Sequence, residues 1–234
     1  MWDISDNRIV EPLIAALMVA TDYFEREYIA IALGVLGDTR AVEPLIKVVE
    51  ECPVAANSLG RIGDLRAVEP LIKYLGSSDD YVRYYATQAL GMLADSQALS
   101  ELERLSREDT TTVEVMHRGV TIADEAKESI ERIKWCQYSV RNLINALSST
   151  NEKERRLAIF ALSKVGDASV LEELNHLIKK LLEIWERKKD STEGIVSRLT
   201  ARETALAAEA IRKRIKQKQR SSFLHDLVKK FSRN

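Results

Sequence analysis

One stretch of this sequence recurs almost unchanged, and that recurrence limits what the chain can fold into. Residues 37–47 are GDTRAVEPLIK and residues 63–73 are GDLRAVEPLIK. A related element that ends in Asp appears four times, at 33–38, 59–64, 90–95 and 162–167. Units of roughly 30 residues are too small to bury a core alone. The repetition therefore predicts a protein in which successive units stack on one another.

Each unit contains two helical patterns. In the first pattern, apolar residues recur at i, i+3, i+4 and i+7, as in Val42, Leu45, Ile46 and Val49. The second pattern has the same spacing over residues 82–93. This spacing places the apolar residues on one face of a helix, and neither helix can bury that face without a partner.

A Gly-Asp pair separates one unit from the next at residues 37–38, 63–64 and 166–167. The glycine suits the left-handed residue that ends a helix. The aspartate carboxylate can accept hydrogen bonds from the unpaired N–H groups at the start of the next helix. These pairs therefore predict where helices end and begin.

A second set of glycines lies inside the second helix of three units, at Gly34, Gly60 and Gly91. Glycine lowers helix propensity by about 1 kcal/mol relative to alanine. Its presence inside a helix is explained most simply by the close approach of a neighbouring helix.

The sequence thus predicts an all-α fold, an α-solenoid (superhelix) of about six antiparallel helix pairs. The second helix of the second pair is short, at about 53–62, and the long last pair is expected to cap the core. The pairs are expected at 3–37, 38–63, 64–94, 95–134, 135–166 and 167–217, and a basic amphipathic helix or tail at 218–234.

The residues also resemble a known family. The pattern Val82-Arg83-x-x-Ala86-x-x-Ala89-Leu90-Gly91, taken with the Gly-Asp element of residues 63–71, is similar to the short HEAT-like repeats found in phycobilisome bilin lyases. The resemblance covers 6–95 and recurs at 140–171. It implies a solenoid, and it leaves the function open because such repeats occur in scaffolds, lyase subunits and maturation factors. No catalytic residue is carried over with it.

The sequence offers little for catalysis, and we expect no enzyme activity, no cofactor and no metal. A HEAT-like iron hydroxylase would show repeated His-Glu pairs, and the three histidines here are followed by Arg118, Leu177 and Asp226. Cys52 precedes Pro53 at a helix start, where the helix dipole would lower a thiol pKa. Without a neighbouring histidine or lysine, packing is the favoured interpretation of Cys52.

One row of equivalent residues on the second helices points away from the core stripe. In a solenoid of helix pairs the second helices line the concave face, so this row predicts a groove for a partner protein with apolar anchors. The alternative, that the same residues pack under neighbouring helices, stays open. The candidate residues are Ile31, Asn57, Gln88 and Phe160, with Glu128 in the same row and Tyr84 one turn from Gln88.

Three arginines, Arg26, Arg83 and Arg155, occupy one equivalent position of the second helix. They could form a basic ladder for an acidic ligand. The favoured alternative is that each arginine bonds to a loop aspartate of an adjacent repeat.

The charge is uneven along the chain. Residues 212–234 hold nine basic residues and one acidic residue, a charge of +8, which leaves -9 on residues 1–211 out of the total of -1. Such a tail could dock on the last helix pair, bind a partner or an anionic membrane, or touch RNA phosphates without specific base recognition. The candidate contacts are Arg212, Arg214, Phe223, Leu227, Lys230 and Phe231.

The favoured function is a non-catalytic scaffold or adaptor that binds another protein on its concave face. Two isolated cysteines, no signal peptide and no membrane-spanning stretch favour the cytoplasm. The first alternative is a lyase-like or maturation subunit of a multi-protein enzyme. The second is association with anionic membrane or RNA through the tail.

Overall fold

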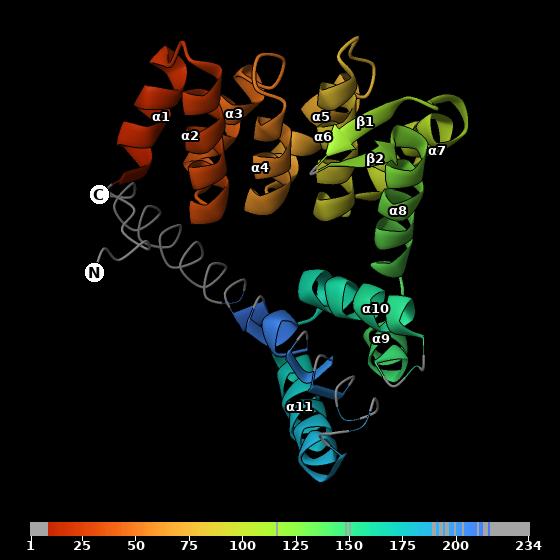
Figure 1. The fold of residues 1–234 in the computed structure, drawn as a ribbon. Helices are drawn as coiled ribbons and strands as arrows, with labels where there is room; N and C mark the ends of the chain where they lie inside the picture. The colour runs from red at the N-terminus through yellow and green to blue at the C-terminus, as the bar shows by residue number, and fades with distance from the viewer. Residues whose placement is uncertain are drawn as a thin grey trace, which may run out of the picture. The chain divides into compact units, whose positions relative to one another are not determined.

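The computed structural model describes residues 9–115, 117–147 and 151–188 and several shorter stretches. Those stretches are 149, 191, 194, 197–198, 200–202, 204–209, 211–212 and 215. The chain divides into two compact units, Met1–Lys134 and Trp135–Asn234. In its described parts the fold is the all-α solenoid of antiparallel helix pairs that the sequence predicts (Figure 1).

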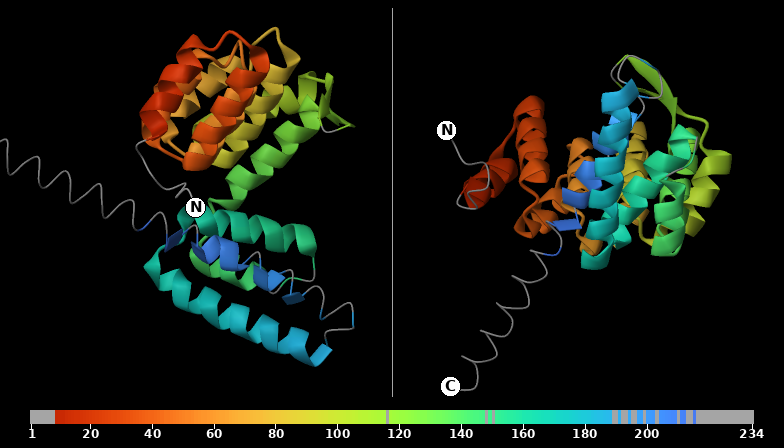
Figure 2. Two further views of the ribbon diagram at one scale, coloured as in Figure 1. Left: turned by 60° about the vertical axis from the view of Figure 1, so that its left-hand side comes forward. Right: turned by 90° about the horizontal axis from the view of Figure 1, so that it is seen from below.

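The first unit consists of four helix pairs. Its helices are α1 (Val10–Val19), α2 (Tyr23–Leu36), α3 (Val42–Lys47), α4 (Val54–Ile62), α5 (Val68–Tyr74), α6 (Asp80–Leu93), α7 (Leu99–Glu108) and α8 (Ile122–Trp135). The second helices α2, α4, α6 and α8 lie in one layer, and the first helices α1, α3, α5 and α7 lie in another (Figures 1 and 2).

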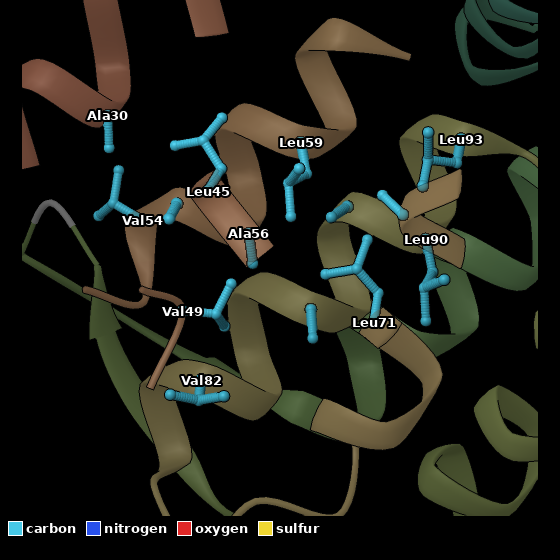
Figure 3. Packing of buried hydrophobic residues seen from close by; sticks show 14 of the residues in the cluster. Ala30, Leu45, Val49, Val54, Ala56, Leu59, Leu71, Val82, Leu90 and Leu93 are labelled. Atoms are coloured by element: carbon cyan, nitrogen blue, oxygen red, sulfur yellow. The ribbon is translucent and has the colours of Figure 1, made fainter. Parts of the chain in front are cut away.

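The core of the first unit lies between these two layers. Leu33, Leu59 and Leu90, which are equivalent in the repeat, are completely buried, as are Leu45 and Leu71 of the first helices. Figure 3 shows several of these side chains pointing into the space between the layers. The apolar stripes of paired helices thus cover each other, as the periodicity predicts.

Short 3₁₀ turns precede three of the first helices, η2 (Thr39–Ala41), η3 (Leu65–Ala67) and η4 (Ser96–Ala98). Each turn is capped by an aspartate carboxylate, which accepts a hydrogen bond of 2.8–3.0 Å from the backbone N–H two residues later. The capping residues are Asp38, Asp64 and Asp95. The Gly-Asp pairs therefore start a 3₁₀ turn first, and the α-helix follows it.

The left-handed helix ends match the sequence at two of the three glycines expected there. Gly37 has φ 67° and Gly63 has φ 76°, whereas Gly166 has φ -61° in an extended conformation. The prediction for Gly166 was therefore wrong. In the third pair Ala94 takes the left-handed conformation, with φ 59°, so that a residue with a Cβ atom ends the helix there.

A β-hairpin lies between α7 and α8, where the sequence indicated only two helices. It pairs β1 (Thr112–Val115) with β2 (Arg118–Thr121) in antiparallel register, from Thr112 opposite Thr121 to Val115 opposite Arg118. Threonine and valine fit the pleated surface of a strand well, and Val113 buries its side chain in the core of the unit.

The second unit contains α9 (Val140–Ala146), α10 (Glu152–Val165) and α11 (Ala168–Lys188). Leu143 of α9, Leu162 of α10 and Leu174 of α11 share one buried cluster with Ala208 and Ile211. This cluster places residues near the end of the described chain in the core, as expected of the last helix pair. Among the described residues, no helix combines the length and the apolar composition that crossing a bilayer requires.

The second helices of the first unit pack unusually closely at the three interior glycines. A Cβ atom on Gly34 would lie 2.8 Å from the Ser58 Cβ, and one on Gly60 would lie 2.9 Å from the Ala89 Cα. At Gly91 it would lie 2.7 Å from the Ser129 Cβ. These distances confirm the close approach predicted from the sequence and fix the spacing of α2, α4, α6 and α8.

Replacing Gly60 by alanine tests this packing. We expect Gly60→Ala to destabilise the protein by about 1–3 kcal/mol, because the backbone of α6 cannot move away from the new Cβ atom. Gly76→Ala is the matched control, since a Cβ there makes only an ordinary contact of 3.5 Å. Urea unfolding followed by circular dichroism measures both variants, and equal stability of the two would contradict the close-packing account.

Candidate functional site

Three of the predicted groove residues lie on neighbouring second helices. Ile31 of α2 is 36% exposed, and Asn57 of α4 and Gln88 of α6 are half-buried. The Asn57 amide donates a hydrogen bond to the Gln88 side-chain oxygen, which links α4 to α6. The Gln88 amide in turn lies 3.5 Å from the Tyr84 hydroxyl. These polar residues thus bridge adjacent repeats on the outer face of the second helices.

Tyr84 differs from the expectation that it would line an open groove. Its side chain is only 4% exposed, and its ring packs edge-on against Tyr85 at 5.1 Å. Burial raises the pKa of Tyr84 to about 12, and the Glu125 carboxylate of α8 contributes to the rise. Tyr84 is therefore a packing residue beneath α8 and not an exposed anchor.

Phe160 lies on α10 in the second unit and is half-buried. The Lys164 ammonium lies 5.8 Å from the centre of its ring, within the range of a cation–π interaction. Phe160 is therefore in the second unit, whereas Ile31, Asn57 and Gln88 are all in the first unit.

The outer face of α2 carries an apolar stripe, of which the sequence reasoning found only Ile31. These residues are between 36% and 71% exposed and recur at i, i+4, i+7 and i+11, so they share one face of the helix. That face is opposite to Leu33, which points into the core. The signal was present in the spacing of α2 itself, which has two apolar faces. The stripe consists of Phe24, Tyr28, Ile31 and Val35.

A surface helix of a globular protein normally carries apolar residues only on the face that packs against the core. Among the described residues of the first unit, the four large apolar side chains of the stripe stay 36–71% exposed. Contiguous exposed patches of this kind mark interaction sites. The stripe is thus the best candidate for a binding surface in the described part of the chain.

The three equivalent arginines make the same contact in each repeat. Arg26 donates to the Ala20 carbonyl at 2.6 Å, Arg83 to the Ser77 carbonyl at 2.9 Å and Arg155 to the Ser149 carbonyl at 2.9 Å. Each acceptor lies six residues before its arginine. Each arginine therefore stabilises the loop that precedes its own helix. This contact favours the structural interpretation over a basic ladder for an acidic ligand.

Arg83 also bonds to the adjacent repeat, as the sequence indicated. Its Nε lies 2.8 Å from the carboxylate of Asp109, the residue that follows α7, and its side chain is 14% exposed. Burial alone would raise the pKa of Asp109, but hydrogen bonds from Arg83 and Thr111 hold it below its usual value. Arg26 makes a comparable ion pair with Glu51 of the next repeat, at 3.2 Å.

Both cysteines are poor nucleophiles. Cys52 is completely buried, and burial raises its pKa even though the Ala55 N–H acts in the opposite direction. Burial raises the pKa of Cys136 to about 11. The thiols are therefore protonated at neutral pH, in line with the packing interpretation of Cys52.

In the parts of the chain that the structure covers, no three His, Cys, Asp or Glu residues lie together as metal ligands would. The tail candidates are largely outside those parts. Arg212 is described and donates a hydrogen bond of 3.0 Å to Asn175 of α11. Arg214, Phe223, Leu227, Lys230 and Phe231 lie outside the described residues.

Two family models match the first unit. The model described as PBS lyase HEAT-like repeat matches residues 25–51, and the model described as HEAT repeats matches residues 54–115. Together they cover most of the stacked helix pairs from α2 to β1.

A protein relative and solved structures extend this likeness. The chain is 36% identical over 108 residues to the phycocyanobilin lyase subunit alpha of Picosynechococcus sp. (strain ATCC 27264 / PCC 7002 / PR-6). That match covers 44% of this chain and 31% of the relative, so the chain spans about a third of the relative's length.

Two solved structures are similar at lower identity. The complex of CpcE and CpcF of phycocyanin lyase from Nostoc sp. PCC7120 is 23% identical, with a TM-score of 0.49, over 83% of this chain and 94% of that chain. Human deoxyhypusine hydroxylase in complex with glycerol is 20% identical, with a TM-score of 0.46, over 87% of this chain and 85% of that chain.

The contacts of Arg83 predict a large stability effect. Arg83→Ala should destabilise the protein by about 2–3 kcal/mol at pH 7, because it leaves Asp109 without its charged partner. Arg61→Ala, on the exposed side of α4, should cost less than about 0.5 kcal/mol. Thermal and urea unfolding provide the comparison.

The sign of the pH dependence follows from Asp109. Its folded pKa is lowered, so the stabilisation is present above the unfolded pKa of about 4 and is lost as the pH falls further. The difference between wild type and Arg83→Ala should therefore shrink under acid conditions. A difference that is constant with pH, or no larger than that of Arg61→Ala, would refute this role for Arg83.

Proposed function

We propose that this chain, a protein of HEAT-like repeats, is a non-catalytic subunit of a lyase-like or maturation assembly that holds a partner protein against its second helices. The observation that carries the proposal is the 36% identity over 108 residues to a phycocyanobilin lyase subunit alpha. This likeness favours a lyase or maturation subunit over the general scaffold that the sequence first suggested.

The surface of the first unit supports binding to a protein. The apolar stripe on α2 includes two aromatic side chains, Phe24 and Tyr28, which are among the residue types enriched in protein interfaces. The neighbouring row of Asn57 and Gln88 supplies amide groups beside it. An apolar strip with polar groups at its edge has the anatomy of a protein interface.

The groups that the sequence offered for chemistry support a non-catalytic role. Arg26, Arg83 and Arg155 are engaged with backbone carbonyls, and the Cys52 thiol has a raised pKa. Side chains engaged in such hydrogen bonds and packing stabilise the repeats. Membrane or RNA contact through the tail, and a location in the cytoplasm, stay predictions.

Affinity capture with two matched variants tests the proposal. The tagged chain is compared with Tyr28→Glu plus Val35→Glu, which places two charges on the stripe. Both positions are exposed, so circular dichroism should show an unchanged fold. The control is Val19→Glu plus Leu65→Glu, two equally exposed apolar positions outside α2.

We expect the wild type and the control to retain one stoichiometric protein from the native cell extract, and the stripe variant to lose it. Mass spectrometry should identify that protein as part of a lyase or maturation system, and co-expression should reconstitute the pair. Retention of that protein by the wild type, the control and the stripe variant alike would show that the stripe is not the binding surface. Capture of a partner with no link to maturation would support the general scaffold function instead.

A further inference from the structure

Three contacts between neighbouring second helices of the first unit are built in the same way. The earlier helix supplies a glycine, and the later helix supplies a small residue that lies against it. The earlier helix also has a small, completely buried residue four positions before the glycine, on the same face. The glycine pairs are Gly34 with Ser58, Gly60 with Ala89, and Gly91 with Ser129. The buried small residues four positions earlier are Ala30, Ala56 and Thr87.

α2 carries the later half of this contact on its free side. Ala32 directly precedes Leu33, so it is equivalent to Ser58, Ala89 and Ser129, which directly precede the matching Leu or Ile of their repeats. Those three residues are buried, whereas Ala32 is half-buried. Within the described residues no second helix comes before α2, which lies at one end of the row of second helices (Figure 1). The glycine that would face Ala32 is therefore missing from that row.

Tyr28 shows the same difference one turn before Ala32. It is 71% exposed, although its equivalent Val54 on α4 is only 8% exposed. The equivalents on α6 and α8 are also covered, since Tyr85 is half-buried and Glu125 is buried. Burial at this position thus accompanies the presence of a preceding second helix. On α2 the same position stays open.

Val35 completes the open surface. Its equivalent on α6 is Met92, whose terminal methyl group would lie 2.7 Å from a Cβ atom on Gly60. This position therefore reaches the preceding helix where one is present, and Val35 is exposed on α2. We call Tyr28, Ala32 and Val35 the receiving face. It shares Tyr28 and Val35 with the apolar stripe, so the two surfaces are continuous.

The repeat itself indicates what fits the receiving face. Because each helix pair is antiparallel, α2, α4, α6 and α8 run parallel to one another. A helix that covers Ala32 as α2 covers Ser58 must also run parallel and must have no Cβ atom at the closest approach. A larger residue there would hold the two helices apart and leave voids around Ala32.

We propose that the partner protein covers the receiving face with a parallel α-helix that carries a glycine opposite Ala32. A small residue four positions before that glycine lies on the same face of the partner helix. Tyr28 and Val35 pack against this helix on either side of the closest approach. The inference rests on the proposed function, because it specifies which segment of the partner protein binds at the stripe.

A peptide pair tests the requirement for glycine. The probe is a fluorescein-labelled, hydrocarbon-stapled helical peptide that copies residues 22–37 and so presents Ala30 and Gly34. Phe24→Gln, Tyr28→Gln and Val35→Gln in the peptide remove its own apolar outer face. The matched peptide has leucine in place of the glycine. Fluorescence anisotropy measures the affinity of both peptides for the full chain.

We expect the wild type to bind the glycine peptide about tenfold more tightly than the leucine peptide, because the added side chain overpacks the contact. Non-specific apolar binding gives the opposite order, since the leucine peptide is more hydrophobic. Equal affinities, tighter binding of the leucine peptide, or no binding of the glycine peptide at up to about 1 mM overturn the proposal.

Variants of Ala32 test the other side of the contact. Ala32→Gly should bind the glycine peptide as the wild type does, and Ala32→Leu should bind it about tenfold more weakly. Ala15→Leu is the matched control, because it adds the same side chain at an exposed position of α1. Circular dichroism and urea midpoints verify that the variants fold. Wild-type affinity in a folded Ala32→Leu contradicts the close approach.

Analytical ultracentrifugation distinguishes the other occupant of this face, a second copy of the chain. We expect the wild type alone to be monomeric at the concentrations used for the peptides. A dimer that Ala32→Leu dissociates, and Ala15→Leu does not, would show that a second copy covers the receiving face. That result overturns the assignment to a helix of the partner protein.

This test and the capture experiment can fail separately. If Ala32→Leu still retains the captured protein while the stripe variant loses it, the glycine-helix proposal is wrong and the proposed function stands. If the peptide preference holds while no maturation partner is captured, the glycine contact stands and the proposed function is wrong.

Discussion

The close approach of the second helices is the constraint on which the rest of the first unit depends. Gly34 faces Ser58, Gly60 faces Ala89, and Gly91 faces Ser129, each at a distance that leaves no room for a Cβ atom. The Ser129 hydroxyl also donates a hydrogen bond of 3.0 Å to the Thr87 carbonyl, so the contact between α6 and α8 is both tight and polar. Small residues at these positions bring the helix backbones together and align their outer faces.

The proposed binding surface follows from that alignment. Because the second helices lie in register, equivalent side chains form rows across the layer, and the row at Asn57 and Gln88 closes by direct hydrogen bonding. On α2 the same outer face is apolar.

Equivalent residues are buried to different extents in different repeats, and this limits what the sequence could predict. Tyr84 of α6 is equivalent to Glu27 of α2, since both lie six residues before the buried leucine of the repeat. Tyr84 is only 4% exposed beside the long helix α8, whereas Glu27, beside the short helix α4, is half-buried. Alignment of the repeats placed Asn57 and Gln88 at equivalent positions, where they form a hydrogen bond, and it could not show how deeply each neighbouring helix buries a residue.

Local chemistry was predictable wherever a single residue type determines it. The interior glycines and two of the predicted capping aspartates, Asp38 and Asp64, behaved as their positions in the repeat indicated. The hairpin at residues 112–121 was not predicted, because it lies between two helices in a unit where the repeat pattern is weak. The left-handed conformation of Ala94 was missed because alanine has no intrinsic preference for it.

The central claim is that a partner protein binds the apolar stripe on the outer face of α2. Hydrogen exchange of the full chain, alone and with the reconstituted partner, measures this most directly. We expect slower exchange at residues 23–36 in the complex, and no change in α3 and α5. Slower exchange confined to α1, α3, α5 and α7 would contradict the claim.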